Sequence, residues 1–150
     1  MKIIMMALLL TCTSLVWGQN LNSFSGDYTL DFSVSACNAN ARVLIDHANV
    51  QIMNPDPRDN RGWSTTKLTL GVSSLRKLPN GNDLITKVSQ NSTDIVVETI
   101  VQKMGREISY QKDIYRFRTS SVRTSLLISL GVETRGNISD YGTTCAYEKK

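Results

Sequence analysis

Apolar and polar residues alternate along most of this chain, which is the pattern of half-buried β-strands. The longest such stretch covers residues 93–117 and has a break at Met104-Gly105. Glycine readily takes the positive φ that a tight hairpin turn requires. We therefore predict a long antiparallel hairpin that turns at Met104-Gly105. The pairs that face one another in this register are Val101 with Ile108, Thr99 with Tyr110, and Ile95 with Ile114.

Seven other segments have the same alternation or are short apolar runs bounded by turn residues. They are residues 25–34, 42–46, 49–53, 63–72, 84–89, 122–135 and 141–147. The segment 122–135 places its apolar residues at even positions from Val122 to Val132, whereas a helix would spread them around most of its circumference. The polar stretch 54–62, with its two prolines, is typical of a surface loop.

These segments amount to about eight or nine strands, with no helix, repeat or linker between them. Short turns join consecutive strands, so the chain predicts a single all-β domain built as an antiparallel meander. A meander that closes into a barrel removes the exposed edges that an open sheet would carry. We therefore predict a β-barrel of about eight or nine strands, and a two-sheet β-sandwich is the alternative.

The first 18 residues have the composition of a secretory signal peptide. A positive charge at Lys2 is followed by an apolar run over residues 3–10, and Val16 and Gly18 are suited to the −3 and −1 positions of a cleavage site. Cleavage after Gly18 leaves residues 19–150 as one exported domain. The expected location is the periplasm or the extracellular space.

This leader has two alternative fates. Lipidation at Cys12 would give a membrane-anchored lipoprotein, but a lipoprotein signal normally has a small residue before the cysteine and Thr11 stands there. A retained transmembrane helix is disfavoured because the apolar run is short and is broken by residues 11–14. We therefore expect no stable membrane span.

Loss of the signal peptide leaves two cysteines, Cys37 and Cys145, near the two ends of the domain. An isolated pair in an oxidising compartment usually forms a disulfide. A loop of this length stabilises the fold by about 4 to 5 kcal/mol in the chain-entropy model. The bond also requires the first and last strands to lie close together. Two cysteines and the single His47 do not have zinc-site spacing, and we expect no metal or cofactor.

The formal net charge of +4 falls to +3 when Lys2 leaves with the signal. Such a mild charge argues against a nucleic-acid partner. The basic residues around the central hairpin are expected on solvated outer faces and strand ends.

The segment Gly26-Asp27-Tyr28 resembles the Gly-x-Trp signature that opens the first strand of lipocalins and related calycin-type barrels, with Tyr28 in place of the tryptophan. The resemblance implies a small secreted barrel with an apolar interior. It also implies that Arg135 corresponds to the arginine that packs on the signature tryptophan. The late helix of the family has no counterpart in this chain.

An enzymatic function is disfavoured because none of the common catalytic motifs is present. A Ser-His-Asp or Cys-His mechanism would have to use His47, which follows Asp46 at the end of a short strand. A histidine there is typical of a turn or surface position. We therefore assign no catalytic residue and predict a protein that is not an enzyme.

The functional hypothesis is a small apolar or anionic lipid-like ligand held inside the barrel. In the predicted hairpin register Lys112 shares the inner face with Tyr110, and Arg116 would follow on that face. A cation in an apolar interior would suit an anionic head group. Against this, Tyr115 and Phe117 are apolar at the opposite parity, which indicates a bulge within residues 112–115. Such a bulge would turn Arg116 outward, and it could turn Lys112 outward as well.

The alternative is a structural or protein-interaction module of the cell envelope or secretome, with its interior filled by its own side chains. Small inward residues such as Thr66, Thr99 and Thr124 either leave room for a ligand or form hydrogen bonds within a packed core. Asn91 and Asn137 begin N-glycosylation sequons in predicted turns, which matter only in a eukaryotic source.

Overall fold

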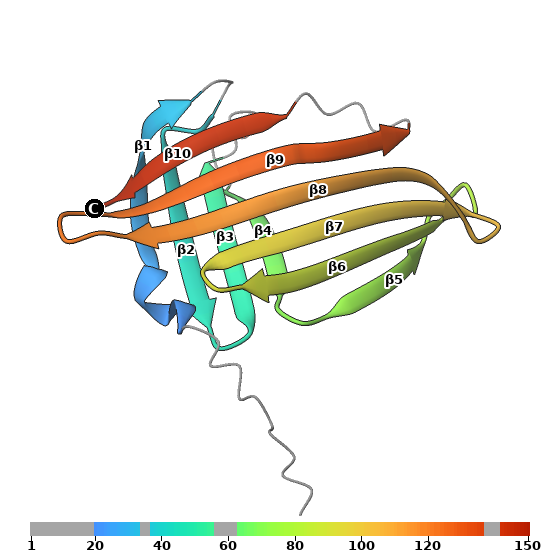
Figure 1. The fold of residues 1–150 in the computed structure, drawn as a ribbon, viewed down its shortest axis with the longest axis horizontal. Helices are drawn as coiled ribbons and strands as arrows, with labels where there is room; N and C mark the ends of the chain where they lie inside the picture. Colours follow the sequence, from blue (N-terminus) through green and yellow to red (C-terminus); the bar gives the residue numbers. More distant parts are fainter. Residues whose placement is uncertain (1–19, 34–36, 56–62, 137–141) are drawn as a thin grey trace, which may run out of the picture.

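The computed structural model describes residues 20–33, 37–55, 63–136 and 142–150 (Figure 1). The predicted signal peptide, Cys12 and the sequon at Asn137 lie outside the described residues. Among the described residues, no helix has the length and apolar character needed to cross a membrane.

The described chain forms one 3-10 helix followed by ten β-strands. They are η1 (Leu21–Phe24), β1 (Gly26–Ser33), β2 (Asn40–Asp46), β3 (Asn49–Pro55), β4 (Trp63–Thr69), β5 (Ser73–Lys77), β6 (Asp83–Asn91), β7 (Asp94–Lys103), β8 (Arg106–Thr119), β9 (Thr124–Gly136) and β10 (Thr143–Lys149).

All ten strands belong to one antiparallel sheet in the order β4-β3-β2-β1-β10-β9-β8-β7-β6-β5. The all-β meander is therefore confirmed, and hydrogen bonds connect the strands as one sheet and not as the two sheets of a sandwich. Figure 1 shows β2 to β4 crossing the direction of β6 to β9, so the sheet folds over on itself and encloses an interior. The first strand, β1, lies beside the last strand, β10, as the predicted disulfide required.

The two edge strands, β4 and β5, are joined by a turn that contacts both ends of the sheet. In this turn Leu70 donates to the carbonyl of Ala48 in the β2–β3 turn, and Gly71 donates to the carbonyl of Val88 on β6. From this turn β4 and β5 diverge, and no ladder pairs them within the described residues (Figure 1). Hydrogen bonds between strands therefore do not close the barrel wall between β4 and β5.

The strand count exceeds the prediction because β5 has no apolar alternation. Its sequence, SSLRK, is exposed at every position, and its one large apolar side chain, Leu75, is 67% exposed. The predicted strand 63–72 ends at Thr69, and its last residues form the turn before β5. Alternation detects a strand only where one face is buried, so this edge strand was missed.

The central hairpin turns where the sequence predicts. The predicted register of its two strands, however, is wrong by one residue. Met104 and Gly105 have φ values of 50° and 75°, and Lys103 pairs with Arg106 across the turn. The register then shifts between Val101 and Gln102. The observed pairs are Val101 with Ser109, Thr99 with Gln111, and Ile95 with Tyr115.

The extra residue in this bulge is Ile108, which explains why the prediction failed. Because a one-residue slip moves every following side chain to the other face, Tyr115 and Phe117 turn into the core. On the other side of β8, Gly136 pairs with Ser109 at a φ of 78°. A Cβ at Gly136 would overlap the carbonyl oxygen of Ile108, so glycine is required for the close approach of β9.

The even positions of β9 face the core near its start, as predicted. Leu126 and Ile128 are buried there and pack in the main hydrophobic cluster. Val122 is an exception, because it lies in the β8–β9 turn and is 87% exposed. The pairing of β8 with β9 is irregular between Lys112 and Ile114, where β9 carries the additional residues around Gly131.

The disulfide between Cys37 and Cys145 is confirmed, with its Cα atoms 5.9 Å apart. It joins the segment after β1 to β10. Cys145 is buried and belongs to the same hydrophobic cluster as Tyr28 and Phe117. The bond therefore lies in the interior of the barrel, across the pair of strands that connects the two ends of the chain.

Candidate functional site: the interior of the barrel

One end of the interior is closed by η1. Leu21 and Phe24 are buried in the core, and the ring of Phe24 lies 5.1 Å from that of Phe117 on β8. The Tyr28 hydroxyl donates to the carbonyl oxygen of Phe24 at 2.6 Å. The Lys149 ammonium donates to the carbonyl oxygen of Ser23 at 2.8 Å. These contacts hold the helix against β1, β8 and β10.

The cation beside Tyr28 differs from the one that the lipocalin resemblance implied. Lys149 on β10 lies opposite Tyr28 in the β1–β10 ladder. Arg135 instead stacks on the ring of Tyr110, 4.3 Å from its centroid. The implied packing of Arg135 on Tyr28 is therefore wrong, because Arg135 is at the far end of β9.

The faces of the sheet can be followed from strand to strand, because residues opposite one another in an antiparallel pair share a face. Near η1 the inward side chains are large, apolar and buried. We call this part of the interior the packed half. Its principal members are Tyr28, Val43, Val50, Ile95, Phe117 and Leu126.

The inward side chains farther along the same strands have a different character. We call them the polar half, and all six of its members keep part of their surface exposed. They are Leu84 and Thr86 on β6, Thr99 and Val101 on β7, and Gln111 and Asp113 on β8. On β7, for example, Ile95 is fully buried whereas Thr99 is partly exposed. The exposed surface indicates that this half is accessible to molecules the size of water.

Tyr115 lies where the two halves meet. The side chain of Tyr115, on β8, forms a hydrogen bond with Thr66 on β4. Because β4 and β8 are not neighbours in the sheet, this contact crosses the interior. Burial is the main reason that the pKa of Tyr115 rises to about 12, and the nearby Asp113 carboxylate raises it further, while the bond to Thr66 lowers it. The Tyr115 hydroxyl is therefore neutral at physiological pH.

The three residues predicted to bind a ligand do not face the interior. Lys112 lies opposite Glu98 on β7 and Glu133 on β9, on the outer face. The predicted interior position of Lys112 is therefore wrong, and the bulge at Ile108 is the reason. A bulge that turns these side chains outward was expected within residues 112–115, but along β7 the shift lies nearer the turn, between Val101 and Gln102.

Tyr110 and Arg116 also make their contacts on the outer face. The Tyr110 hydroxyl donates to Glu98 at 2.8 Å. Burial and the Glu98 carboxylate raise the pKa of Tyr110 to about 12. Arg116 donates to Asp94 at 3.0 Å, and Arg118 contacts the same carboxylate. These side chains connect β8 to β7 on the outer face of the barrel.

His47 occupies a turn, as the sequence predicts. It has a φ of 54°, its side chain is 89% exposed, and its ring contacts the Asp46 carboxylate beside it. No inward-facing partner lies near it in the β2–β3 ladder, where the last pair is Asp46 with Asn49.

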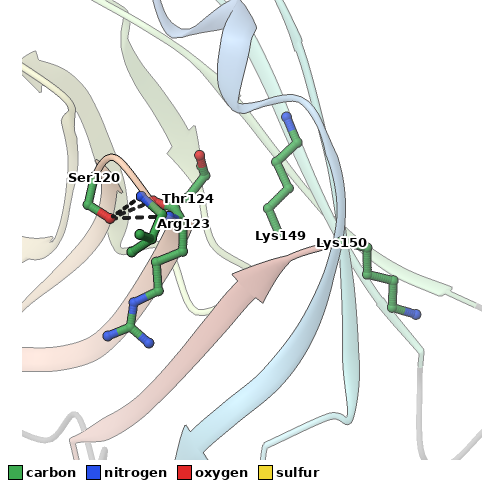
Figure 2. A pocket seen from close by; sticks show the side chains of 6 residues that line it. Ser120, Arg123, Thr124, Lys149 and Lys150 are labelled. Carbon is green, nitrogen blue, oxygen red and sulfur yellow. Dashed lines mark hydrogen bonds between the residues drawn. The ribbon is translucent and has the colours of Figure 1, made fainter.

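Two hollows lie near the closed end of the barrel. One has a volume of about 330 Å³ and is lined by the β8–β9 turn and the end of β10 (Figure 2). Figure 2 shows the charged ends of Arg123, Lys149 and Lys150 pointing in different directions, so these cations do not converge on one anion. The other hollow has a volume of about 250 Å³ and is lined in part by Arg116, Arg118 and Arg123.

Comparison with known proteins is informative for the fold. No protein-family model matches the chain, and no curated protein matches it. Lipid binding protein 8 (LBP-8) of Caenorhabditis elegans aligns with a TM-score of 0.50 at 7% identity, over 87% of this chain and 98% of that chain. This likeness shows that the chain has the same overall fold as that protein. The REP1-NXSQ fatty acid transporter aligns with a TM-score of 0.45 at 11% identity, over 85% of this chain and 96% of that chain.

Proposed function

We propose that this chain is an exported, non-enzymatic barrel protein that binds a small apolar or lipid-like ligand in the polar half of its interior. The observation that carries the proposal is the contrast in burial along single strands. On β8 the inward residue Phe117 is fully buried, whereas Gln111 and Asp113 keep exposed surface. Small barrels of this kind can hold one ligand. LBP-8, the protein of similar fold reported above, is named a lipid binding protein.

Export is supported by the leader and by the cysteines. Residues 1–18 have the composition of a signal peptide, and cleavage would leave residues 19–150. The Cys37–Cys145 disulfide is compatible with an oxidising compartment, such as the periplasm or the extracellular space. Under this proposal the protein meets its ligand outside the cytoplasm.

A structural or interaction module is the second candidate. The packed half supports it, because the protein's own side chains fill that part of the interior. The edge strands β4 and β5 also support it, since an unpaired edge can accept a strand from a partner. This candidate requires no ligand in the polar half.

Titration with Nile red separates the two candidates, because this neutral apolar dye becomes fluorescent when it leaves water. The exported protein, stripped of co-purified lipid, should bind the dye saturably. Thr99→Phe, which fills the polar half, should weaken binding at least tenfold. The matched variant Ile100→Phe changes the adjacent outward residue and should leave binding unchanged. Absence of saturable binding, or equal loss in both variants, would favour the structural module.

A further inference from the structure

Asp113 is the one charged member of the polar half. It lies opposite the buried Val97 on β7, so its side chain shares the inner face. Its Oδ1 accepts hydrogen bonds from Gln111 Nε2 at 2.9 Å and from the backbone N–H of Gly131 at 2.8 Å. These two bonds fix the position of the carboxylate. They also connect β8 to the irregular part of β9, so Asp113 has a structural role as well.

No cation of the described residues shares the level of Asp113 on the inner face. Among the described lysines and arginines of the strands, those with inward register are Lys149, Arg76 and the pair Lys103 and Arg106. Lys103 and Arg106 flank the hairpin turn, and Lys103 is six residues along β7 from Val97, the partner of Asp113, or about 20 Å. The Lys149 ammonium is engaged at the closed end by Ser23. Arg76, on the exposed edge strand β5, belongs to the row of Ser109, four residues from Asp113 along β8, or about 13 Å.

The other polar groups at this level are neutral. Thr99 and Gln111 face one another across β7 and β8, and the Tyr115 hydroxyl lies at the boundary with the packed half. A ligand carboxylate placed among them would meet the Asp113 charge with no nearby cation, and like charges in a poorly solvated site disfavour each other. A hydroxyl or ammonium group could instead donate a hydrogen bond to the carboxylate.

We propose that the interior prefers ligands whose polar end is a hydrogen-bond donor, such as a long-chain alcohol or amine, over the corresponding carboxylate. This inference rests on the proposed function, because it requires a ligand in the polar half. Asp113 is the specificity-determining residue. The anionic head group that the predicted inward position of Lys112 suggested is disfavoured, because Lys112 lies on the outer face. The apolar part of the ligand would contact Leu84 and Val101.

Displacement of Nile red by three ligands of equal chain length tests the preference. We expect dodecanol and dodecylamine to displace the dye at concentrations at least tenfold lower than dodecanoate. Asp113→Asn keeps the shape of the side chain and should narrow the difference at least fivefold. Glu98→Gln removes a charge from the outer face and should leave the ranking unchanged. Equal or tighter binding of dodecanoate to the unmodified protein would overturn the inference.

A gain of binding keeps the test decisive if Asp113→Asn fails to fold. Thr99→Lys adds an ammonium beside Gln111 on the inner face and should tighten dodecanoate binding at least tenfold, whereas Ile100→Lys places the charge outside and should not. If Thr99→Lys leaves dodecanoate binding unchanged, the head group does not lie at the level of Thr99 and Asp113, and the inference is overturned. If Nile red itself does not bind, the proposed function fails, which is distinct from dye binding with dodecanoate preferred.

Discussion

The packed half and the polar half of the interior are built on the same strands, yet they have opposite properties. The packed half is apolar and is fixed by η1, where Phe24 stacks on Phe117 and Tyr28 donates to the backbone of Phe24. The polar half has hydroxyl, amide and carboxylate groups that keep exposed surface. The difference shows that one end of the interior is filled by apolar side chains, whereas the other end carries polar groups that keep exposed surface.

The bulge at Ile108 is the feature that separates inside from outside on β8. It brings Gln111 and Asp113 inward and turns Tyr110, Lys112 and Arg116 outward. Without it the interior would contain a lysine and an arginine. One inserted residue therefore reverses the charge of the candidate site.

The largest expected effect comes from removing a side chain of the packed half. Phe117→Ala should lower the free energy of unfolding by about 3–5 kcal/mol, because it leaves a cavity beside Phe24. Val101→Ala, in the polar half, should cost about 1 kcal/mol, since that side chain is already partly exposed. Chemical denaturation of both variants measures the contrast. Similar losses would mean that the two halves are equally packed.

A smaller effect is expected at the close approach of β8 and β9. Gly136→Ala should lower the free energy of unfolding by about 1–3 kcal/mol, because its φ of 78° and the nearby Ile108 carbonyl both disfavour a side chain. Gly81→Ala has a similar φ of 81° but open space around it, so it isolates the cost of the backbone conformation. If both variants lower the free energy of unfolding by the same amount, the close approach of the Ile108 carbonyl adds no cost at Gly136.

The titration of tyrosines should report the burial of Tyr28 in the packed half and of Tyr115 at its boundary, without a large change in stability at neutral pH. Burial raises the pKa values of Tyr28 and Tyr115 to about 12, whereas tyrosines in the unfolded chain ionise near 10. The unfolded state therefore loses protons first, and the free energy of unfolding should fall as pH rises from 10 to 12. Tyr115→Phe should reduce this fall. Phenolate absorbance during denaturation at each pH provides the measurement, and an unchanged slope would contradict the burial of Tyr115.

Much of the fold follows from the sequence because most strands have one buried face. Alternation located nine of the ten strands, glycine located the turn at Met104-Gly105, and the cysteine pair placed β1 beside β10. The edge strand β5 was missed because neither of its faces is buried.

The candidate site was harder to predict, because the residues of two alternations compete on β8. Ile108, Tyr110 and Ile114 are apolar at one parity, and Tyr115 and Phe117 at the other. The conflict predicts a bulge within residues 112–115, but strand pairing decides which set of residues reaches the core, and along β7 the register shifts between Val101 and Gln102. The polar members of the inner face, such as Gln111 and Asp113, carry no sequence signal that distinguishes them from solvated residues.

The most direct test of a ligand in the polar half is amide chemical-shift mapping by NMR during a titration with dodecanol. The account predicts saturable shifts at Thr99, Gln111 and Asp113, with much smaller shifts at Val43 and Leu126 in the packed half. Shifts confined to the outer hollow around Arg118 and Arg123, or no saturable shifts at all, would contradict it.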